Sequence, residues 1–319
     1  MSDRPEILVL GPTRPAKLAE LGSDFTLHRL DLADDPEALL AEVGPRIRGA
    51  VTTGGVGLDR ALLEHLPKLE IVSSSGVGYD AIDVDACSEH GIIVTNTPDV
   101  LTDDVADAAL GLLINARRNM VAGHDHVRSG RWGQEGAMPL TSTLRAKRLG
   151  IVGLGRIGSA IASRAEAFGL EIGYTARSER TKSPYTFRAT ARELAEWADI
   201  LIAVVPGSAE TEGMIDAQVL DALGPDGTFI NVARGSVVDE PALIAALKDG
   251  RIANAALDVF WSEPAPDEAL TQLPNVVLYP HHASGTTETR DAMSGLVNDN
   301  LRAHFAGRPP LTPVNAARV

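Results

Sequence analysis

The fold is decided by the stretch Leu149-Gly150-Ile151-Val152-Gly153-Leu154-Gly155-Arg156-Ile157-Gly158, in which a short apolar run ends in a G-x-G-x-x-G pattern. A helical pattern, 159–168, follows directly. Gly153 permits the tight turn, Gly155 lets a pyrophosphate approach the backbone, and Gly158 lets the helix pack closely on the strand. The N-terminus of that helix offers unpaired N–H groups to phosphates. Strand, turn and helix in this order favour a dinucleotide-binding loop over an ordinary tight turn.

The composition predicts a two-domain cytoplasmic protein. A chain of 319 residues with 44% hydrophobic residues is long enough for two buried cores. Its net charge of −14 argues against nucleic acid or an anionic membrane as the main partner, although local arginines can still bind a small anion. The single cysteine, Cys87, excludes an internal disulfide. The start, 1–6, lacks the apolar core of a signal peptide, and no apolar run approaches the ~20 residues of a membrane span.

Short apolar runs alternate with helical patterns over the first hundred residues. This βαβα order predicts a parallel sheet covered on both faces. The expected strands are 7–10, 25–30, 50–53, 71–74 and 92–95, and the expected helices are 15–21, 36–43, 59–66 and 83–90. A long helix is expected over 101–120, with Asp103 and Asp104 at its start, where acidic side chains suit the helix dipole. An irregular excursion, 129–147, holds Trp132 and Met138.

A second series of the same kind follows the glycine pattern. Its expected strands are 149–152, 171–174, 200–205, 228–232, 255–259 and 276–279, and a last helix is expected over 287–305. The sequence therefore predicts an α/β protein of two doubly wound, Rossmann-like domains with the active site in the cleft between them. We expect a discontinuous substrate domain, 1–99 plus 287–319, and a cofactor domain, 100–286.

Three segments of the second series place reactive side chains where a strand gives way to a loop. They are 230–235, 256–264 and 278–285, and they supply Arg234, Glu263 and His281. Ligands of open α/β sheets bind at these strand ends. A guanidinium can hold a carboxylate and polarise a carbonyl, and a histidine can deliver a proton near neutral pH. A carboxylate beside that histidine fixes its tautomer and favours its protonated form. Together these groups suit the reduction of a 2-keto acid.

These segments resemble the D-2-hydroxyacid dehydrogenase family, and within it the glyoxylate/hydroxypyruvate and hydroxyphenylpyruvate reductases. The resemblance covers nearly the whole chain and includes 76–80, 101–107 and 231–251. It implies that Arg234, Glu263 and His281 are catalytic and that Asp258 contacts the nicotinamide carboxamide. It also implies that the backbone amides of Val77 and Gly78 hold the substrate carboxylate together with Arg234. The remaining residues that it places at the cofactor are Thr102, Gly153, Gly155, Arg156, Ile157, Gly158, Val205, Pro206, Thr211, Val232, Ala233, Ser284 and Gly285.

The second strand of the cofactor domain predicts NADP(H), with NAD(H) possible. Enzymes of this fold that use NAD carry an acidic residue at the end of that strand, where it binds the ribose 2′-hydroxyl. Here the strand ends in Thr175-Ala176-Arg177-Ser178-Glu179-Arg180, and the acid is missing at the strand end. Arg177, Ser178 and Arg180 are instead suited to a 2′-phosphate.

Each of these residues also has an ordinary structural interpretation. Arg234 could be an ion-pair partner beside a helix, Glu263 a solvated turn residue, and Asp258 a turn cap. His282 is the control for the assignment of His281, since an error of one position would exchange the two. Alternative functions are another dehydrogenase of the family, for phosphoglycerate, erythronate phosphate or D-lactate, and a cofactor-sensing protein like the corepressors of this fold.

Other features give weaker expectations. His124 and His126 do not share a helix face and are expected to be solvated. No His, Cys and Asp cluster has zinc-like spacing, so we expect no metal. Cys87 is expected in the core. The loop 52–57 is expected to face the substrate side chain. The apolar helix 101–120 and the irregular segment after it predict a homodimer, and the family resemblance implies that the segment 132–140 reaches towards the partner subunit.

Overall fold

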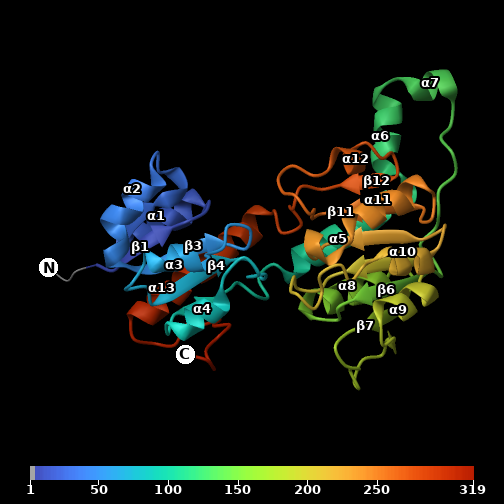
Figure 1. Ribbon diagram of the computed structural model, residues 1–319. Helices are drawn as coiled ribbons and strands as arrows, with labels where there is room; N and C mark the ends of the chain where they lie inside the picture. The colour runs from blue at the N-terminus through green and yellow to red at the C-terminus, as the bar shows by residue number, and fades with distance from the viewer. Residues whose placement is uncertain (1–3) are drawn as a thin grey trace. The chain divides into compact units, whose positions relative to one another are not determined.

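The computed structural model describes residues 4–319, so the first three residues, on which part of the expected N-terminal segment falls, lie outside the described residues. The chain divides into a first unit, residues 4–101 with 285–319, and a second unit, residues 102–284. Each unit is built on a parallel sheet, which confirms the predicted fold class (Figure 1). Among the described helices, none is long and apolar enough to cross a membrane.

The first unit contains a five-stranded sheet in the order β2-β1-β3-β4-β5, and every neighbouring pair is parallel. Its strands are β1 (Glu6–Val9), β2 (Thr26–Arg29), β3 (Ile47–Thr53), β4 (Ile71–Ser75) and β5 (Ile93–Thr95). The helices between them are α1 (Pro15–Asp24), α2 (Pro36–Val43), α3 (Arg60–Glu64) and α4 (Val84–Glu89), with short 3-10 turns η1 (Leu30–Leu32) and η2 (Gly44–Arg46). The strands and helices of this series follow the predicted order, with ends shifted by a few residues.

Alternation of apolar residues along each strand builds two cores in this unit. Leu8 and Val72 face a core that includes Cys87 of α4, whereas Ile7 and Ile71 face a core on the opposite side. Cys87 is fully buried, as predicted, and burial raises the pKa of its thiol to about 12. Both faces of the sheet are therefore covered, as expected for parallel strands.

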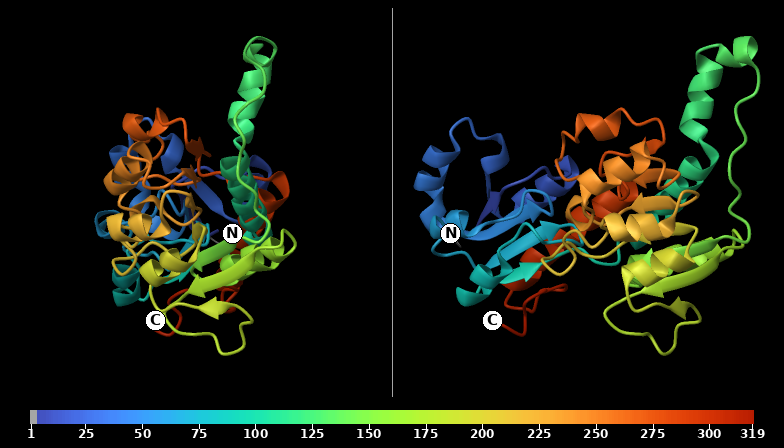
Figure 2. Two further views of the ribbon diagram at one scale, coloured as in Figure 1. Left: turned by 90° about the vertical axis from the view of Figure 1, so that its right-hand side faces the viewer. Right: turned by 45° about the vertical axis from the view of Figure 1, so that its right-hand side comes forward.

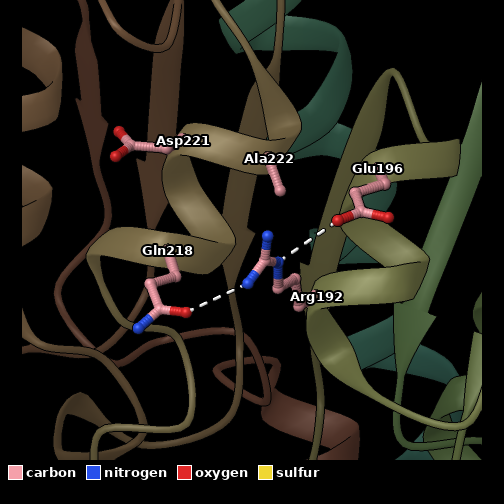
Figure 3. A pocket seen from close by; sticks show the side chains of 5 residues that line it. All are labelled: Arg192, Glu196, Gln218, Asp221 and Ala222. Carbon is pink, nitrogen blue, oxygen red and sulfur yellow. Dashed lines mark hydrogen bonds and ion pairs between the residues drawn. The ribbon is translucent and has the colours of Figure 1, made fainter.

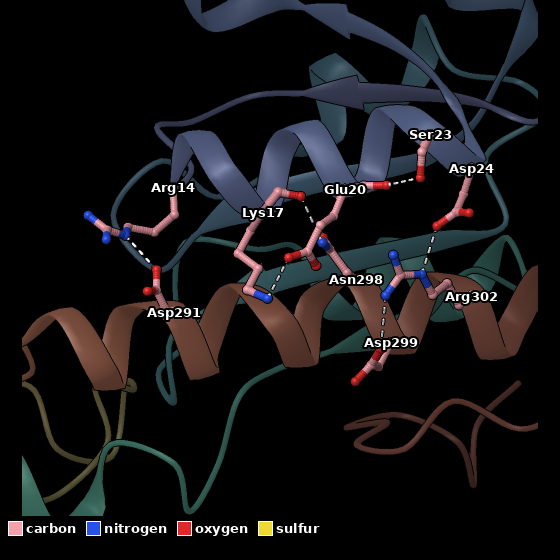
Figure 4. A network of polar contacts seen from close by, with 9 residues as sticks. All are labelled: Arg14, Lys17, Glu20, Ser23, Asp24, Asp291, Asn298, Asp299 and Arg302. Carbon is pink, nitrogen blue, oxygen red and sulfur yellow. Dashed lines mark hydrogen bonds and ion pairs between the residues drawn. The ribbon is translucent and has the colours of Figure 1, made fainter.

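The last helix, α13 (Thr287–Phe305), packs on the first sheet. Val297 and Leu301 belong to the core that includes Ile7 and Ile71. Figure 4 shows how α1 lies along α13: Arg14 Nε is 2.7 Å from Asp291 Oδ1, and Arg302 Nε is 2.8 Å from Asp24 Oδ2. The Asn298 amide donates to the Lys17 carbonyl between these two ion pairs. A C-terminal segment thus completes a unit that begins at the N-terminus.

The second unit contains a seven-stranded parallel sheet in the order β12-β11-β10-β9-β6-β7-β8. Its strands are β6 (Arg148–Val152), β7 (Glu171–Thr175), β8 (Thr186–Phe187), β9 (Ile200–Ala203), β10 (Thr228–Asn231), β11 (Asn254–Leu257) and β12 (Val276–Leu278). The edge strand β8 was not predicted, because two residues carry no recognisable alternation. The crossover helices are α5 (Thr102–Arg118), α8 (Arg156–Glu166), α9 (Ala191–Trp197), α10 (Ala217–Leu223), η3 (Gly235–Val237), α11 (Glu240–Lys248) and α12 (Glu268–Thr271).

The predicted single helix 101–120 is wrong at its C-terminal end. Asn119 adopts a left-handed conformation with φ 48°, and a new helix, α6 (Met120–Arg128), starts after it. The apolar pattern of the sequence continues through Asn119, so the pattern did not indicate the break. Asparagine tolerates this left-handed conformation better than most residues. Figure 2 shows α6 and α7 (Arg131–Glu135) projecting from the rest of the second unit. We call residues 120–140 the arm.

The arm corrects a second expectation. His124 is exposed, but His126 is buried, and its Nε2 lies 2.9 Å from the carbonyl oxygen of Gly136. The chain folds back after α7 and covers His126, which a helical pattern in the sequence does not reveal. The base of the arm is held by Arg117, which is buried and donates to the carbonyl oxygens of Asp226 and Thr143.

Candidate active site

The parallel strands of the second unit bring the predicted site segments to one edge of its sheet. The loops that carry Gly153, Val205, Val232 and Asp258 follow β6, β9, β10 and β11, which are neighbours in the sheet. The loop after β12 carries His281. Main-chain hydrogen bonds continue past the strand ends, from Val232 N to the Ala203 carbonyl and from Asp258 N to the Asn231 carbonyl. The strand-end loops therefore start from a fixed frame.

The glycine loop has the conformation that its sequence predicts. Gly153 has φ 104°, which is rarely adopted by residues with a side chain. A Cβ added at Gly158 would overlap the carbonyl oxygen of Gly153, so this position needs the close approach that only glycine allows. A Cβ added at Gly155 would meet no atom within 4 Å, which leaves the space beside its backbone open.

Two further observations fit a dinucleotide at this loop. Helix α8 starts at Arg156 after Gly155, and no side chain caps its first-turn N–H groups. Phosphate oxygens are good acceptors for such groups. In addition, the Thr102 hydroxyl at the start of α5 is buried without a hydrogen-bond partner. The residues present therefore fit the cofactor, whereas no group of three His, Cys, Asp or Glu among the described residues could hold a metal ion.

The loop after β7, residues 175–180, is here named the arginine loop. The N–H of Arg180 donates to the Tyr174 hydroxyl at 2.7 Å, so a buried tyrosine fixes the loop backbone. The side chains of this loop are exposed instead: Arg177 is 87% exposed, and its Nε is 3.9 Å from Oε2 of Glu210, which is 78% exposed. Ser178 and Arg180 are also exposed. Glu210 was not predicted, because it lies in a distant loop.

The loop after β12, residues 279–284, is named the histidine loop, and Asp258 holds it in place. The Asp258 side chain is 2% exposed, and its oxygens accept from the N–H groups of His282 at 2.7 Å and Ala283 at 3.2 Å. Its carbonyl oxygen accepts from His281 N at 2.7 Å. Burial raises the pKa of Asp258, and the two N–H donors partly offset this rise. The structure therefore gives Asp258 the turn-holding role that the sequence left open.

His281 and Glu263 form a hydrogen bond at the candidate site. Nδ1 of His281 lies 2.7 Å from Oε2 of Glu263, and the two side chains are 44% and 34% exposed. His281 has φ 48°, an uncommon conformation that the contacts of Asp258 support. The neighbouring His282 instead packs its ring edge-on against Tyr279, with 5.8 Å between ring centroids. The two histidines thus have different surroundings, and His281 contacts the carboxylate.

Several groups hold Glu263 in its ionised form. Burial raises the pKa of its carboxyl, but the hydrogen bonds from His281 and from the Phe260 N–H at 3.0 Å, together with the positive charge of Arg234, leave the pKa below its ordinary value. An ionised carboxylate only accepts hydrogen bonds, so Nδ1 of His281 is the donor in this pair. The other ring nitrogen, Nε2, is then the one that can deliver or take a proton.

Arg234 extends from the end of β10, and its backbone is fixed by its neighbours. The Asn231 amide donates to the Arg234 carbonyl at 2.9 Å, and Arg234 Nη1 donates to the Ala233 carbonyl at 2.8 Å. A Cβ on the next residue, Gly235, would overlap the carbonyl of Phe260, so the two loops pack in direct contact. This packing joins the Arg234 segment to the segment that carries Glu263.

Two side chains that the sequence did not single out support the Glu263 loop. Glu240 is buried, and its Oε2 accepts from the Trp261 N–H at 3.1 Å. The Trp261 indole donates to the Val238 carbonyl at 2.7 Å. Glu240 follows the helix cap Asp239 and looks like an ordinary first-turn acid, so no local signal would have identified it.

In the first unit, Val77 and Gly78 lie in the loop after β4, as the sequence predicts for a strand-end loop. The Asn96 amide donates to the Val77 carbonyl at 2.9 Å. The loop 52–57 is closed by the buried Thr52 hydroxyl, which donates to the Gly57 carbonyl at 2.7 Å. Gly285 also belongs to this unit, whereas Ser284 ends the second unit.

A groove of about 460 Å³ lies between α9 and α10 and holds none of the predicted site residues (Figure 3). Arg192 is at its centre and contacts Glu196 and Gln218, each at 3.2 Å. Asp221, which also lines the groove, is paired with Arg251. Because the charged groups of this groove already have protein partners, the strand-end loops are the better candidate site.

Comparison with known proteins identifies the family to which these loops belong. The family described as D-isomer specific 2-hydroxyacid dehydrogenase, NAD binding domain, matches residues 110–283. Hydroxyphenylpyruvate reductase of Plectranthus scutellarioides is 47% identical over 308 residues, which cover 97% of this chain and 98% of that protein. The glyoxylate/hydroxypyruvate reductase A HPR2 of Arabidopsis thaliana shows the same identity and coverage.

A solved structure adds information on the cofactor. The NADPH-dependent glyoxylate/hydroxypyruvate reductase of Sinorhizobium meliloti, in complex with NADP and malonate, is 48% identical and superposes with a TM-score of 0.93. The alignment covers 98% of this chain and 97% of that one.

Proposed function

The chain belongs to the D-isomer specific 2-hydroxyacid dehydrogenase family, and we propose that it reduces a small 2-keto acid of the glyoxylate or hydroxypyruvate type with NADPH. It is an oxidoreductase acting on CH–OH groups, as its relatives are. The observation that carries the proposal is the 2.7 Å contact between His281 Nδ1 and Glu263 Oε2, with the positive charge of Arg234 acting on the same carboxylate.

The proposed roles follow from the chemistry of these side chains. His281 protonates the carbonyl oxygen of the substrate from Nε2, since Nδ1 is bonded to Glu263. Glu263 stabilises the protonated imidazole and fixes the orientation of the ring. Arg234 holds the carboxylate and polarises the carbonyl. Val77 and Gly78 bind the carboxylate through backbone N–H groups. A bound nicotinamide supplies the hydride that reduces the carbonyl carbon to the D-2-hydroxy acid.

Most residues proposed to hold the cofactor lie at the strand ends of the second unit, and Thr102 at the start of α5 and Gly285 of the first unit are proposed to join them. The glycine loop and the first turn of α8 bind the pyrophosphate, and Arg177, Ser178 and Arg180 bind the 2′-phosphate of NADP(H). The open space at Gly155 and the unpartnered Thr102 hydroxyl support this assignment. The remaining positions proposed to line the site are Gly153, Arg156, Ile157, Gly158, Val205, Pro206, Thr211, Val232, Ala233, Asp258, Ser284 and Gly285.

The test is a steady-state assay with NADPH and a panel of 2-keto acids compared by kcat/KM. We expect glyoxylate or hydroxypyruvate to give the highest value. Turnover of a phosphorylated acid or of pyruvate in preference to these would favour another dehydrogenase of the family. Tight cofactor binding with no turnover on any member of the panel would favour a cofactor-sensing protein and contradict the proposed function.

We also propose that the enzyme is a cytoplasmic homodimer. The arm carries large apolar side chains that are exposed in the single chain, namely Met120, Val121, Val127, Trp132 and Leu140. A monomer rarely leaves such a group uncovered, so a second copy of the chain is the expected partner. Light scattering at micromolar concentration is expected to give the mass of a dimer, and the mass of a monomer would contradict this proposal.

A further inference from the structure

The loop of Val77 and Gly78 is held by two consecutive residues that follow β5. The Asn96 amide nitrogen, Nδ2, donates to the Val77 carbonyl at 2.9 Å. Thr97 N donates to the Gly76 carbonyl at 2.8 Å, and the Thr97 hydroxyl accepts from Gly76 N at 2.9 Å. We call residues 76–78 the amide loop. The Gly76 carbonyl oxygen thus accepts from Thr97, and the Val77 carbonyl oxygen accepts from Asn96.

These bonds determine where the N–H groups of the amide loop point. In a trans peptide the C=O and N–H bonds point in opposite directions. The Gly76 carbonyl points to Thr97, so the N–H of Val77, in the same peptide group, points away from Thr97. The Val77 carbonyl points to Asn96, so the N–H of Gly78 points away from Asn96. Within the described residues, neither of these two N–H groups has an acceptor. They are therefore two fixed donors available to a ligand.

Asn96 is itself held from the other end of the chain. Its carbonyl oxygen accepts from the Thr312 hydroxyl at 2.6 Å, and its N–H donates to the Thr312 carbonyl at 3.3 Å. The buried Asn300 of α13 donates to the Thr312 hydroxyl at 2.9 Å and accepts from Thr312 N at 3.1 Å. A run of bonds thus links α13, the C-terminal tail and the amide loop.

We propose that Asn96 is a positioning residue for the substrate carboxylate, holding the N–H groups of Val77 and Gly78 in the direction in which they bind it. This inference rests on the proposed function, because the ligand of the two donors is the carboxylate of a 2-keto acid. Asn96 touches neither substrate nor cofactor in this role. The C-terminal tail acts through it, since Thr312 fixes the Asn96 backbone.

The chain offers a matched control in Asn315. Its side chain is also buried, and it binds the same edge strand: Oδ1 accepts from Val94 N at 2.9 Å, and Nδ2 donates to the Ile92 carbonyl at 2.9 Å and to the Ser88 hydroxyl. It makes no hydrogen bond to the amide loop. Loss of Asn315 therefore measures the cost of removing a buried asparagine at β5 without the effect on the loop.

The experiment compares Asn96→Ala with Asn315→Ala in the full-length enzyme. For Asn96→Ala, KM for the 2-keto acid and the inhibition constant of the unreactive analogue oxamate are expected to rise about ten-fold or more, because two donors to a charged group lose their orientation. KM for NADPH is expected to change less than two- to three-fold. Tm is expected to fall in both variants by a similar amount, because each loses a buried asparagine. In Asn315→Ala, however, KM for the keto acid and the inhibition constant of oxamate are expected to change little.

A second variant covers the case in which Asn96→Ala does not fold. Thr97→Val keeps the shape of the side chain but removes the acceptor for Gly76 N, and it is expected to raise the same two constants by a smaller factor. The inference about Asn96, but not the proposed function, would be overturned by either of two results. One is an unchanged KM for the keto acid and an unchanged inhibition constant of oxamate in the folded Asn96 or Thr97 variant. The other is an equal rise of these constants in the Asn315 variant. A wild-type enzyme that neither reduces a 2-keto acid nor binds oxamate would overturn the proposed function and the inference with it.

Discussion

The histidine loop and the arginine loop both follow strands of the seven-stranded sheet, but they are held in different ways. The histidine loop follows edge strand β12 and is fixed by the buried carboxylate of Asp258 and by the hydrogen bond between His281 and Glu263. The arginine loop follows β7, and only its backbone is fixed, by Tyr174. The groups that we propose for proton transfer are thus oriented by the protein, whereas the side chains that we propose for the cofactor phosphate are exposed and can adapt to it.

This difference has a physical reason. Proton transfer depends on the direction and distance of one ring nitrogen, so a small displacement is costly to the rate. A phosphate dianion can be bound by flexible guanidinium groups from several directions, and the contact gains more from charge than from rigidity. Four predictions test the comparison, from the largest expected effect to the smallest.

Removal of His281, the proposed proton donor, should have the largest effect. His281→Ala is expected to lower kcat by about 10²–10⁴-fold, the usual contribution of general acid catalysis. His282→Ala is the matched control, because His282 packs on Tyr279 and its side chain does not contact Glu263. It is expected to lower kcat far less. A larger loss of kcat in the His282 variant would show that the two histidines have been assigned the wrong roles.

Removal of the two arginines proposed to bind the 2′-phosphate should affect one cofactor only. In the double variant Arg177→Ala, Arg180→Ala, KM for NADPH is expected to rise about ten-fold or more, since each charged hydrogen bond contributes roughly 1.5–3 kcal/mol. KM for NADH and the thermal stability are expected to stay unchanged, because both side chains are exposed. Equal increases of KM for the two cofactors would mean that these arginines serve another purpose.

The lowered pKa of Glu263 should make stability depend on pH in one direction. The pKa of Glu263 is lowered in the folded protein, so its stabilising contribution is present above the unfolded pKa of about 4.3 and is lost as pH falls through the lower folded value. Denaturant unfolding at pH 7 is expected to show wild type more stable than Glu263→Gln by about 1 kcal/mol. This gap should close below about pH 4, and a gap that instead widens with acid would contradict the assigned direction.

The smallest effect concerns the exposed pair of Arg177 and Glu210. Glu210 competes with a phosphate for the guanidinium, and an exposed pair is worth roughly 0.2–1 kcal/mol. Glu210→Gln is therefore expected to lower KM for NADPH by at most about five-fold and to leave KM for NADH unchanged. Glu212→Gln, in the same loop, is the control. A rise of KM for NADPH in the Glu210 variant would show that Glu210 supports the loop rather than competes with the cofactor.

Local patterns in the sequence were sufficient to predict the α/β fold class and the order of most elements. Alternation of apolar runs and helical patterns sets the secondary structure, and the glycine pattern specifies one turn whose geometry few other residues could adopt. The strand-end positions of Arg234, Glu263 and His281 could also be predicted, because residues that follow parallel strands meet at one edge of the sheet, while their catalytic roles stay a prediction. The contact between His281 and Glu263 follows from that rule.

Contacts between distant segments decided the rest. The left-handed turn at Asn119 and the burial of His126 depend on how the arm folds back, and a helical pattern in the sequence predicts neither of them. The two carboxylate oxygens of Asp258 accept hydrogen bonds from His282 and Ala283, which lie 24 and 25 residues further along the chain. Likewise Asn96 and Glu210 carry no local signal, since their partners come from other strands and loops. The sequence by itself determined the fold class, the order of most elements and which reactive residues follow the strands. Only the tertiary structure decided which side chains meet, because hydrogen bonds and ion pairs act between atoms that the chain brings together over long separations.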